Sequence, residues 1–275
     1  MLWQRKARAV RSMPVIGEFF STVRCHPLLS ILTPVLLAVA VVVRTRQLFD
    51  FYSTSHQVLA CAADAFVAVD AGLGTDMGLK GIVLLPLFLC MLMVFSKNDS
   101  REQYVLRRRS RSTMWRILFT KMIALSLVLS AFLTAITALT GIRMTDKLMN
   151  WNEKGSIFWA LCRESLDYEL TFAKVAFVFF FVIFMTLVFT GAVFLLMQWL
   201  FSNMFVGWML CMGLVFSETF IGGTVCVFYG RVTIGYFLWI ESFPLVTLVI
   251  GSLAVVLLFT GAGYYFGRRK EFYGK

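Results

Sequence analysis

Long apolar stretches separated by short polar ones dominate the chain and predict helices that cross a membrane. A helix rises ~1.5 Å per residue, so about 20 apolar residues span the hydrocarbon core of a bilayer. Pro34 and Pro86 fall inside two of the stretches and predict kinks there. We therefore expect an all-α integral membrane protein with six transmembrane helices, at residues 27–43, 81–95, 117–139, 171–200, 205–229 and 243–266.

Residues 1–26 form a basic segment ahead of the first span. Within it, Val15, Ile16, Phe19, Phe20 and Val23 recur at helical spacing, which predicts a cytoplasmic helix lying in the membrane interface. A cleaved signal peptide is the competing interpretation. The long basic region and the apolar run that continues to residue 43 favour an uncleaved first span. We expect two units, the interfacial helix at 1–26 and a six-span domain at 27–275.

The segments between spans carry their own expectations. The stretch 57–69 is apolar but short and bears Asp64, with Asp70 next to it, so it predicts a helix on, or dipping into, the outer leaflet. Trp151 and Trp159 favour an interfacial helix within 140–169. The phenylalanines of the fourth span are typical of lipid-facing bulk. Cys61 and Cys162 both fall in outer segments and could pair.

Charge sets the expected orientation. The chain is 59% hydrophobic and 15% charged, with a net charge of +11. The positive charge lies at the ends of apolar spans, which argues against a nucleic-acid-binding protein. The two termini and the connections expected on the same side hold 17 Lys and Arg and 4 acids, against 9 and 11 elsewhere. Basic loops stay on the cytoplasmic side, so we expect a multi-pass protein of a bacterial plasma membrane with both termini in the cytoplasm.

The densest charge lies between the second and third spans. Residues 96–121 hold eight Lys or Arg and two acids. Arg101, Tyr104 and Arg108 have helical spacing and predict a short helix on the membrane surface, able to dock a second protein. Ser112 is a candidate N-cap for the next helix, which Trp115 and Lys121 would anchor at the interface, as Lys174 and Gln198 would at the ends of the fourth span. The alternative is that these arginines only fix topology and bind lipid head groups.

Candidate chemistry is sparse. The two histidines and six cysteines show no metal-ligand spacing, and no paired acids or Ser/His arrangement falls at membrane depth. We predict no catalytic, cofactor-binding or metal-binding residue, and therefore not an enzyme. Glu218 is an acid within the fifth span. It is a candidate pathway or interface residue, or else a carboxyl solvated near the outer interface.

Several of these pieces together resemble the permease subunit of ABC exporters of the type-2 (ABC-2) class. The stretch from Glu18 through Arg24 to Pro34 is similar to that family's interfacial helix and first span. The basic loop is similar to its coupling-helix loop, and most similar in permeases of the peptide-antibiotic export and self-immunity group. The turn at Ser202 and Asn203 resembles its second cytoplasmic contact, and the aromatic and basic residues 264–270 resemble its exit.

The resemblance implies half of a transporter that moves a peptide, antibiotic or other amphipathic substrate outward by alternating access. Two ATP-binding subunits would bind ATP and Mg, and a second permease chain, identical or different, would complete the pathway in the lipid. It implies contacts with the ATP-binding subunit at Glu102, Tyr104, Val105, Arg107, Arg108, Ser202 and Asn203. A non-transporting immunity or scaffold protein is an alternative, and an intramembrane enzyme is a weaker one.

Overall fold

The fold, seen in a computed structural model, is a bundle of long helices. The structure describes residues 26–56, 58–71, 79–99, 111–164, 166, 168–201, 203–221, 234–240 and 245–269. Among these residues there are eight α-helices and no strand, with a π-helical turn, η2 (Lys80–Leu84), and a 3-10 turn, η3 (Tyr236–Trp239). The α-helices are α3 (Pro27–His56), α4 (Asp64–Ala71), α5 (Leu85–Asp99), α7 (Arg111–Met144), α8 (Ile157–Cys162), α9 (Phe172–Phe201), α10 (Met204–Ile221) and α11 (Leu245–Arg269).

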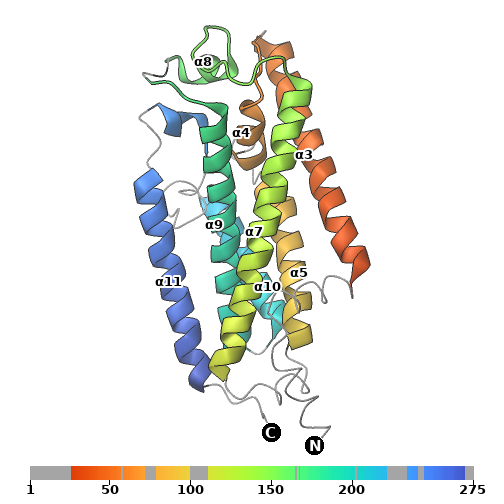
Figure 1. Cartoon of the computed structure of the whole chain (residues 1–275), viewed down its shortest axis with the longest axis vertical. Helices are drawn as coiled ribbons and strands as arrows, with labels where there is room; N and C mark the ends of the chain where they lie inside the picture. Colours follow the sequence, from red (N-terminus) through yellow and green to blue (C-terminus); the bar gives the residue numbers. More distant parts are fainter. Residues whose placement is uncertain are drawn as a thin grey trace, which may run out of the picture.

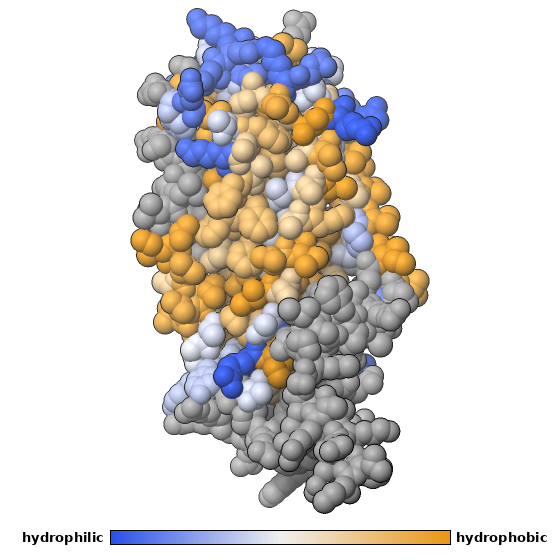
Figure 2. Space-filling view, viewed as in Figure 1, coloured by the Kyte–Doolittle hydropathy of each residue, from blue (hydrophilic) through white to orange (hydrophobic). Residues whose placement is uncertain are grey.

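Four of these regions are long and apolar enough to cross a membrane, which supports the prediction of a multi-pass helical membrane protein. They are Ile31–Thr54, Lys80–Lys97, Thr113–Met144 and Phe172–Phe201, while α10 and α11 contribute the shorter apolar runs Met204–Ser217 and Val249–Tyr265. Apolar side chains cover a band of the surface between polar ends (Figure 2). The band matches what a bilayer would solvate.

The first and third spans are longer than predicted. Helix α3 continues to His56, so Arg46 lies within the helix and pairs with Asp50 one turn on, at 3.6 Å. No glycine or proline lies between residues 35 and 56 to stop it. Helix α7 begins at Arg111 rather than after an N-cap at Ser112.

Helix α9 is the central element of the bundle. It contacts α4, α5, α7, α10 and α11, and most of its side chains are buried. The prediction that its phenylalanines face lipid is therefore wrong for Phe179 and Phe189, which are 0% and 7% exposed, and holds for Phe177. A helix that is apolar on every side is typical of one covered by other helices all round.

The helices alternate in direction, so the connections gather at two ends (Figure 1). The terminal end holds the starts of α3 and α7, the ends of α5 and α11, and the turn between α9 and α10. The α8 end holds α8, η3 and the segment from α7 to α9, and α4 lies just inside it, between α9 and α7 in this view (Figure 1).

Of the two placements predicted for the stretch 57–69, on the outer leaflet or dipping into it, the buried position of helix α4 argues against a helix lying on the surface. Helix α4 packs against α3, α7 and α9, and every residue from Cys61 to Asp70 is buried. The two residues predicted to anchor the third span at the interface are also buried, whereas Lys174, predicted to anchor the fourth span, is exposed. Trp115 is 1% exposed and meets the edge of the Trp199 ring at 5.4 Å, and Lys121 is 2% exposed. Trp151 is likewise buried, whereas Trp159 is partly exposed.

Gly141 sets how closely α4 approaches α7. A Cβ at this position would lie 2.6 Å from the backbone oxygen of Ala62. We expect Gly141→Ala to destabilise the protein by roughly 1–3 kcal/mol, because a backbone atom must shift to make room. Thermal unfolding in mild detergent measures the effect. Gly213→Ala is the matched control, since no atom lies within 4 Å of a Cβ there and alanine favours the helix. Equal melting temperatures for the two variants would contradict this packing.

Candidate functional site

The most unusual feature of the chain is a cluster of polar side chains buried around α4. Two backbone hydrogen bonds tie the approach to this helix to the segment after α7, from the Ala62 amide to the Lys147 carbonyl at 2.9 Å and from the Ala63 amide to the Leu148 carbonyl at 3.2 Å. The Asp64 carboxylate then accepts the Cys61 amide at 2.8 Å and closes the first turn. It satisfies an amide that the start of a helix otherwise leaves open.

Asp64 is fully buried and holds two aromatic side chains from distant parts of the chain. Its Oδ1 accepts the Trp151 indole N–H at 2.7 Å and the Tyr236 hydroxyl at 3.0 Å. Burial raises the pKa of Asp64 because it removes the charged carboxylate from water, and the hydrogen bonds offset part of that shift. Burial likewise raises the pKa of the neighbouring Cys61 thiol, so it stays protonated at neutral pH.

Asp70, at the other end of α4, has a different environment. The Lys80 ammonium donates to its Oδ1 at 2.8 Å, and the Ile234 amide donates to its Oδ2 at 2.7 Å. The Asp70 side chain is 0% exposed and the Lys80 side chain 11%. Lys80 opens the π-helical turn η2 that leads into α5. Such turns are rare in helices and occur often at functional sites.

Aromatic rings enclose the cluster from the α8 end. Trp151 stacks on Phe158 at 5.1 Å between ring centroids and meets the rings of Tyr236 and Trp239 edge-on. The Tyr168 hydroxyl donates to the Trp239 carbonyl at 2.6 Å. The short segment 234–240 is thus held by both acids of α4 and by this aromatic layer.

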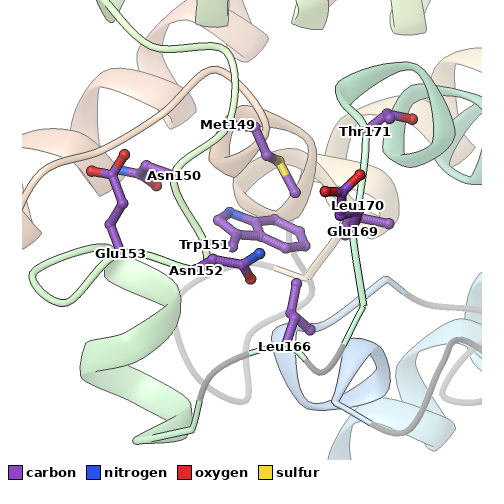
Figure 3. A pocket seen from close by; sticks show the side chains of 9 residues that line it. All are labelled: Met149, Asn150, Trp151, Asn152, Glu153, Leu166, Glu169, Leu170 and Thr171. Carbon is purple, nitrogen blue, oxygen red and sulfur yellow. The ribbon is translucent and has the colours of Figure 1, made fainter.

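A cavity of ≈ 270 Å³ lies beside Trp151 (Figure 3). Its lining combines apolar side chains with Asn150, Asn152 and Thr171 and with the exposed residues Glu153 and Glu169. The Lys147 ammonium binds Glu153 at 2.6 Å. Within the described residues no group of three or more His, Cys, Asp or Glu could hold a metal ion.

Most residues predicted to contact an ATP-binding subunit lie outside the described residues. This applies to Glu102, Tyr104, Val105, Arg107, Arg108 and Ser202. Asn203 is described and caps α10, since its Oδ1 accepts the Phe205 amide at 2.9 Å. Helix α9 ends at Phe201 and α10 begins at Met204, so the connection between them is as short as predicted. Glu218 belongs to α10, and its side chain is outside the described part.

The pairing left open between Cys61 and Cys162 is not formed: both are free thiols, and Cys61 is completely buried beside Asp64. The prediction for Gln198 is wrong. Gln198 does not reach out to the interface. It is buried and its Oε1 accepts the Ser96 hydroxyl at 2.6 Å, which ties α9 to α5. A polar pair inside a bundle is more stable than either group facing lipid alone.

Sequence reasoning did not identify the α4 cluster as a site. Two acids in a short apolar stretch, followed by Lys80 at the start of the next one, are the signal that could have found it. Comparison with protein-family models, with curated proteins and with solved structures gave no match. The function must therefore be argued from the arrangement of the residues themselves.

Because the Asp70–Lys80 pair is buried, we expect it to contribute to the free energy of unfolding. We expect Lys80→Met to destabilise the protein by roughly 3–5 kcal/mol, because it leaves a buried carboxylate without its cation. The double variant Asp70→Asn with Lys80→Met should recover part of that loss, as a double-mutant cycle in detergent would show.

The control is the exposed pair of Lys147 and Glu153, whose side chains are 51% and 50% exposed. Lys147→Met should cost about 1 kcal/mol or less. If Lys80→Met is as stable as Lys147→Met, the buried pair does not contribute the stability proposed for it.

Proposed function

We propose that this chain is the permease subunit of an ATP-driven exporter, working with separate ATP-binding subunits. The observation that carries the proposal is the path of η2 and α5. At one end, Lys80 is ion-paired to Asp70 in the buried cluster. At the other end, Asp99 leads directly into the basic connection before α7. One short helix thus joins a candidate docking segment to the polar layer at the α8 end.

The terminal end offers several contacts to a soluble partner. It carries the basic connection between α5 and α7, the turn at Asn203, and the basic end of α11 at Arg269. We infer that this end faces the cytoplasm, since basic segments resist translocation. The proposed docking residues are those of the connection, namely Glu102, Tyr104, Val105, Arg107 and Arg108, together with Ser202 and Asn203.

In this proposal ATP and Mg bind to two copies of the partner subunit, and closure of that pair pushes on the connection. Helices α5 and α7 run from it through the bundle, so they carry the movement toward the α8 end. The substrate path would lie between this chain and a second permease chain, identical or different, with Glu218 of α10 as a candidate residue of the path or interface. A peptide, antibiotic or other amphipathic molecule is the proposed substrate class.

One observation favours a second candidate, a non-transporting immunity or scaffold protein. The acids of α4 fasten α4 to α5, η3 and the segment after α7 by close hydrogen bonds, and a permanently closed layer would suit a protein that only binds. Reconstitution of the chain with its ATP-binding subunit in vesicles separates the two. ATP-dependent movement of substrate supports the exporter, and binding without movement supports the scaffold.

Docking is tested at the basic connection. We expect Tyr104→Ala and Arg108→Glu each to abolish copurification with the ATP-binding subunit and to lower stimulated ATPase activity at least tenfold, because they remove the side chains proposed to make the contact. Lys154→Glu, an exposed charge reversal at the α8 end, is the control and should behave as wild type. Unchanged ATPase coupling in both connection variants, with the protein still folded, would refute the docking role.

Orientation is tested separately with a membrane-impermeant amine reagent. In intact cells we expect labelling of Lys154, judged by its loss in Lys154→Arg. An Arg109→Lys substitution in the basic connection should add no label until the membrane is permeabilised. Labelling of this new lysine in intact cells would place the basic connection outside the cell. That result would contradict both the predicted orientation and the exporter proposal.

A further inference from the structure

The two acids of α4 face opposite kinds of partner. Asp70 is paired with the Lys80 ammonium, whereas the groups that donate to Asp64 are all neutral, namely the amide and thiol of Cys61, the Trp151 indole and the Tyr236 hydroxyl. No cation contacts Asp64 among the described residues. A carboxylate buried without a counter-charge is unfavourable, and the usual outcome is that it takes up a proton.

The titratable and charged groups around Asp64 leave it in this state. The hydroxyls of Tyr52 of α3 and Tyr236 of η3 and the thiol of Cys61 lie within electrostatic reach of Asp64, and none of the three is a cation. The Lys80 charge is engaged by Asp70, and Lys147 is exposed and engaged by Glu153. On α7, Gly141 packs against Ala62 and Ala65. Helix α9 presents Phe172 and Phe179 to Phe66 of α4, and Lys174 lies over the Tyr168 ring.

The hydrogen bonds around Asp64 can serve both of its protonation states. An amide and an indole N–H only donate, so they bind a carboxyl oxygen with a free lone pair in either state. A hydroxyl can donate or accept. When Asp64 is charged, the Tyr236 hydroxyl donates to Oδ1. When Oδ1 carries a proton, that proton needs an acceptor. The Tyr236 oxygen, at 3.0 Å, is the strongest acceptor among these partners, because an amide N–H and an indole N–H cannot accept and a thiol sulfur accepts only weakly.

We propose that Asp64 is a reversible proton-binding site whose occupancy reverses the hydrogen bond to Tyr236 and so changes how η3 is held against α4. A proton taken from solvent forms the O–H bond on Oδ1, and its release restores the carboxylate, with no other bond made or broken. Asp70 binds the same segment through the Ile234 amide and its Lys80 ion pair. One acid therefore anchors residues 234–240 while the other senses protons.

Burial supports the proposal by raising the pKa of Asp64. It also raises the pKa of Tyr236 well above its ordinary value, so the phenol keeps its proton and stays able to serve in both roles. The site needs no ATP-binding subunit. Its test therefore runs on the purified chain, and its failure would leave the exporter proposal standing.

The test is infrared difference spectroscopy of the full chain in detergent, titrated from about pH 4 to about pH 9. We expect a protonated carboxyl C=O band at about pH 6, where an ordinary carboxyl is ionised. The band should be absent in Asp64→Asn and present in Asp146→Asn, the control at an exposed acid. A wild-type spectrum without this band, or one that Asp146→Asn removes equally, would overturn the proposal.

Tyr236→Phe keeps the test decisive if Asp64→Asn fails to fold. Without the hydroxyl, the protonated carboxyl loses its acceptor, so its C=O band should move to higher frequency. The charged form loses one donor, so the titration midpoint should rise by roughly one pH unit. A midpoint and band unchanged in Tyr236→Phe would show that Tyr236 does not exchange roles.

Stability against pH gives a second readout. The unfolded chain releases the Asp64 proton near about pH 4, while the folded chain holds it to higher pH. The folded state therefore binds more protons in that window, and the free energy of unfolding should fall as pH rises from about 4 through the midpoint seen in the infrared. Asp64→Asn should lack this fall relative to Asp146→Asn. A slope shared by both variants would contradict proton binding at Asp64.

Discussion

Every polar group withdrawn from water must find a partner, and this requirement organises the α8 end of the protein. Asp64 and Asp70 lie on a helix of eight residues, too short to cross a bilayer. Because both carboxyls are buried, they draw in partners from distant positions, namely Trp151, Tyr236, Lys80 and the Ile234 amide. The partners come from the segment after α7, from η2 and from η3. Two side chains thus fix the relative positions of four parts of the chain.

Apart from the Ser96–Gln198 hydrogen bond between α5 and α9, the rest of the bundle is held mainly by apolar packing around α9, which is non-directional. The α4 contacts are directional and tolerate little displacement. The two ends of the molecule therefore differ in mechanical character. The α8 end is cross-linked by short polar contacts, whereas the terminal end carries a tight turn at Asn203 and the basic connection that follows Asp99. This asymmetry suits a protein driven from one end and gated at the other.

Hydropathy was sufficient to predict the long helices, because the length of an apolar run reports directly on what a membrane requires. It could not predict which faces are buried. In α9 every position is apolar, so no periodicity distinguishes Phe179 inside the bundle from Phe177 outside it. The prediction of interfacial tryptophans failed for a related reason. Trp151 donates to the distant Asp64 carboxyl and Trp115 packs on the distant Trp199 ring, and the sequence shows neither partner. The α4 cluster depends on such long-range pairs throughout. The acids were visible in the sequence, but their partners were not.

The path of α5 connects the two proposals. Lys80 lies on the π-turn at its head, where one extra residue per turn re-aims a side chain that a regular helix would direct elsewhere. In the proposed exporter, a push on the basic connection beyond Asp99 would reach Lys80 through α5 and η2 and would act on its ion pair with Asp70. Asp70 also holds the Ile234 amide, and Tyr236, two residues further on, is held by Asp64. Movement of α5 and protonation of Asp64 would therefore act on the same short segment from opposite ends of α4. If residues 234–240 move only when the contacts of both Asp70 and Asp64 are weakened, their movement would depend on ATP hydrolysis by a partner subunit and on the proton concentration at the α8 end.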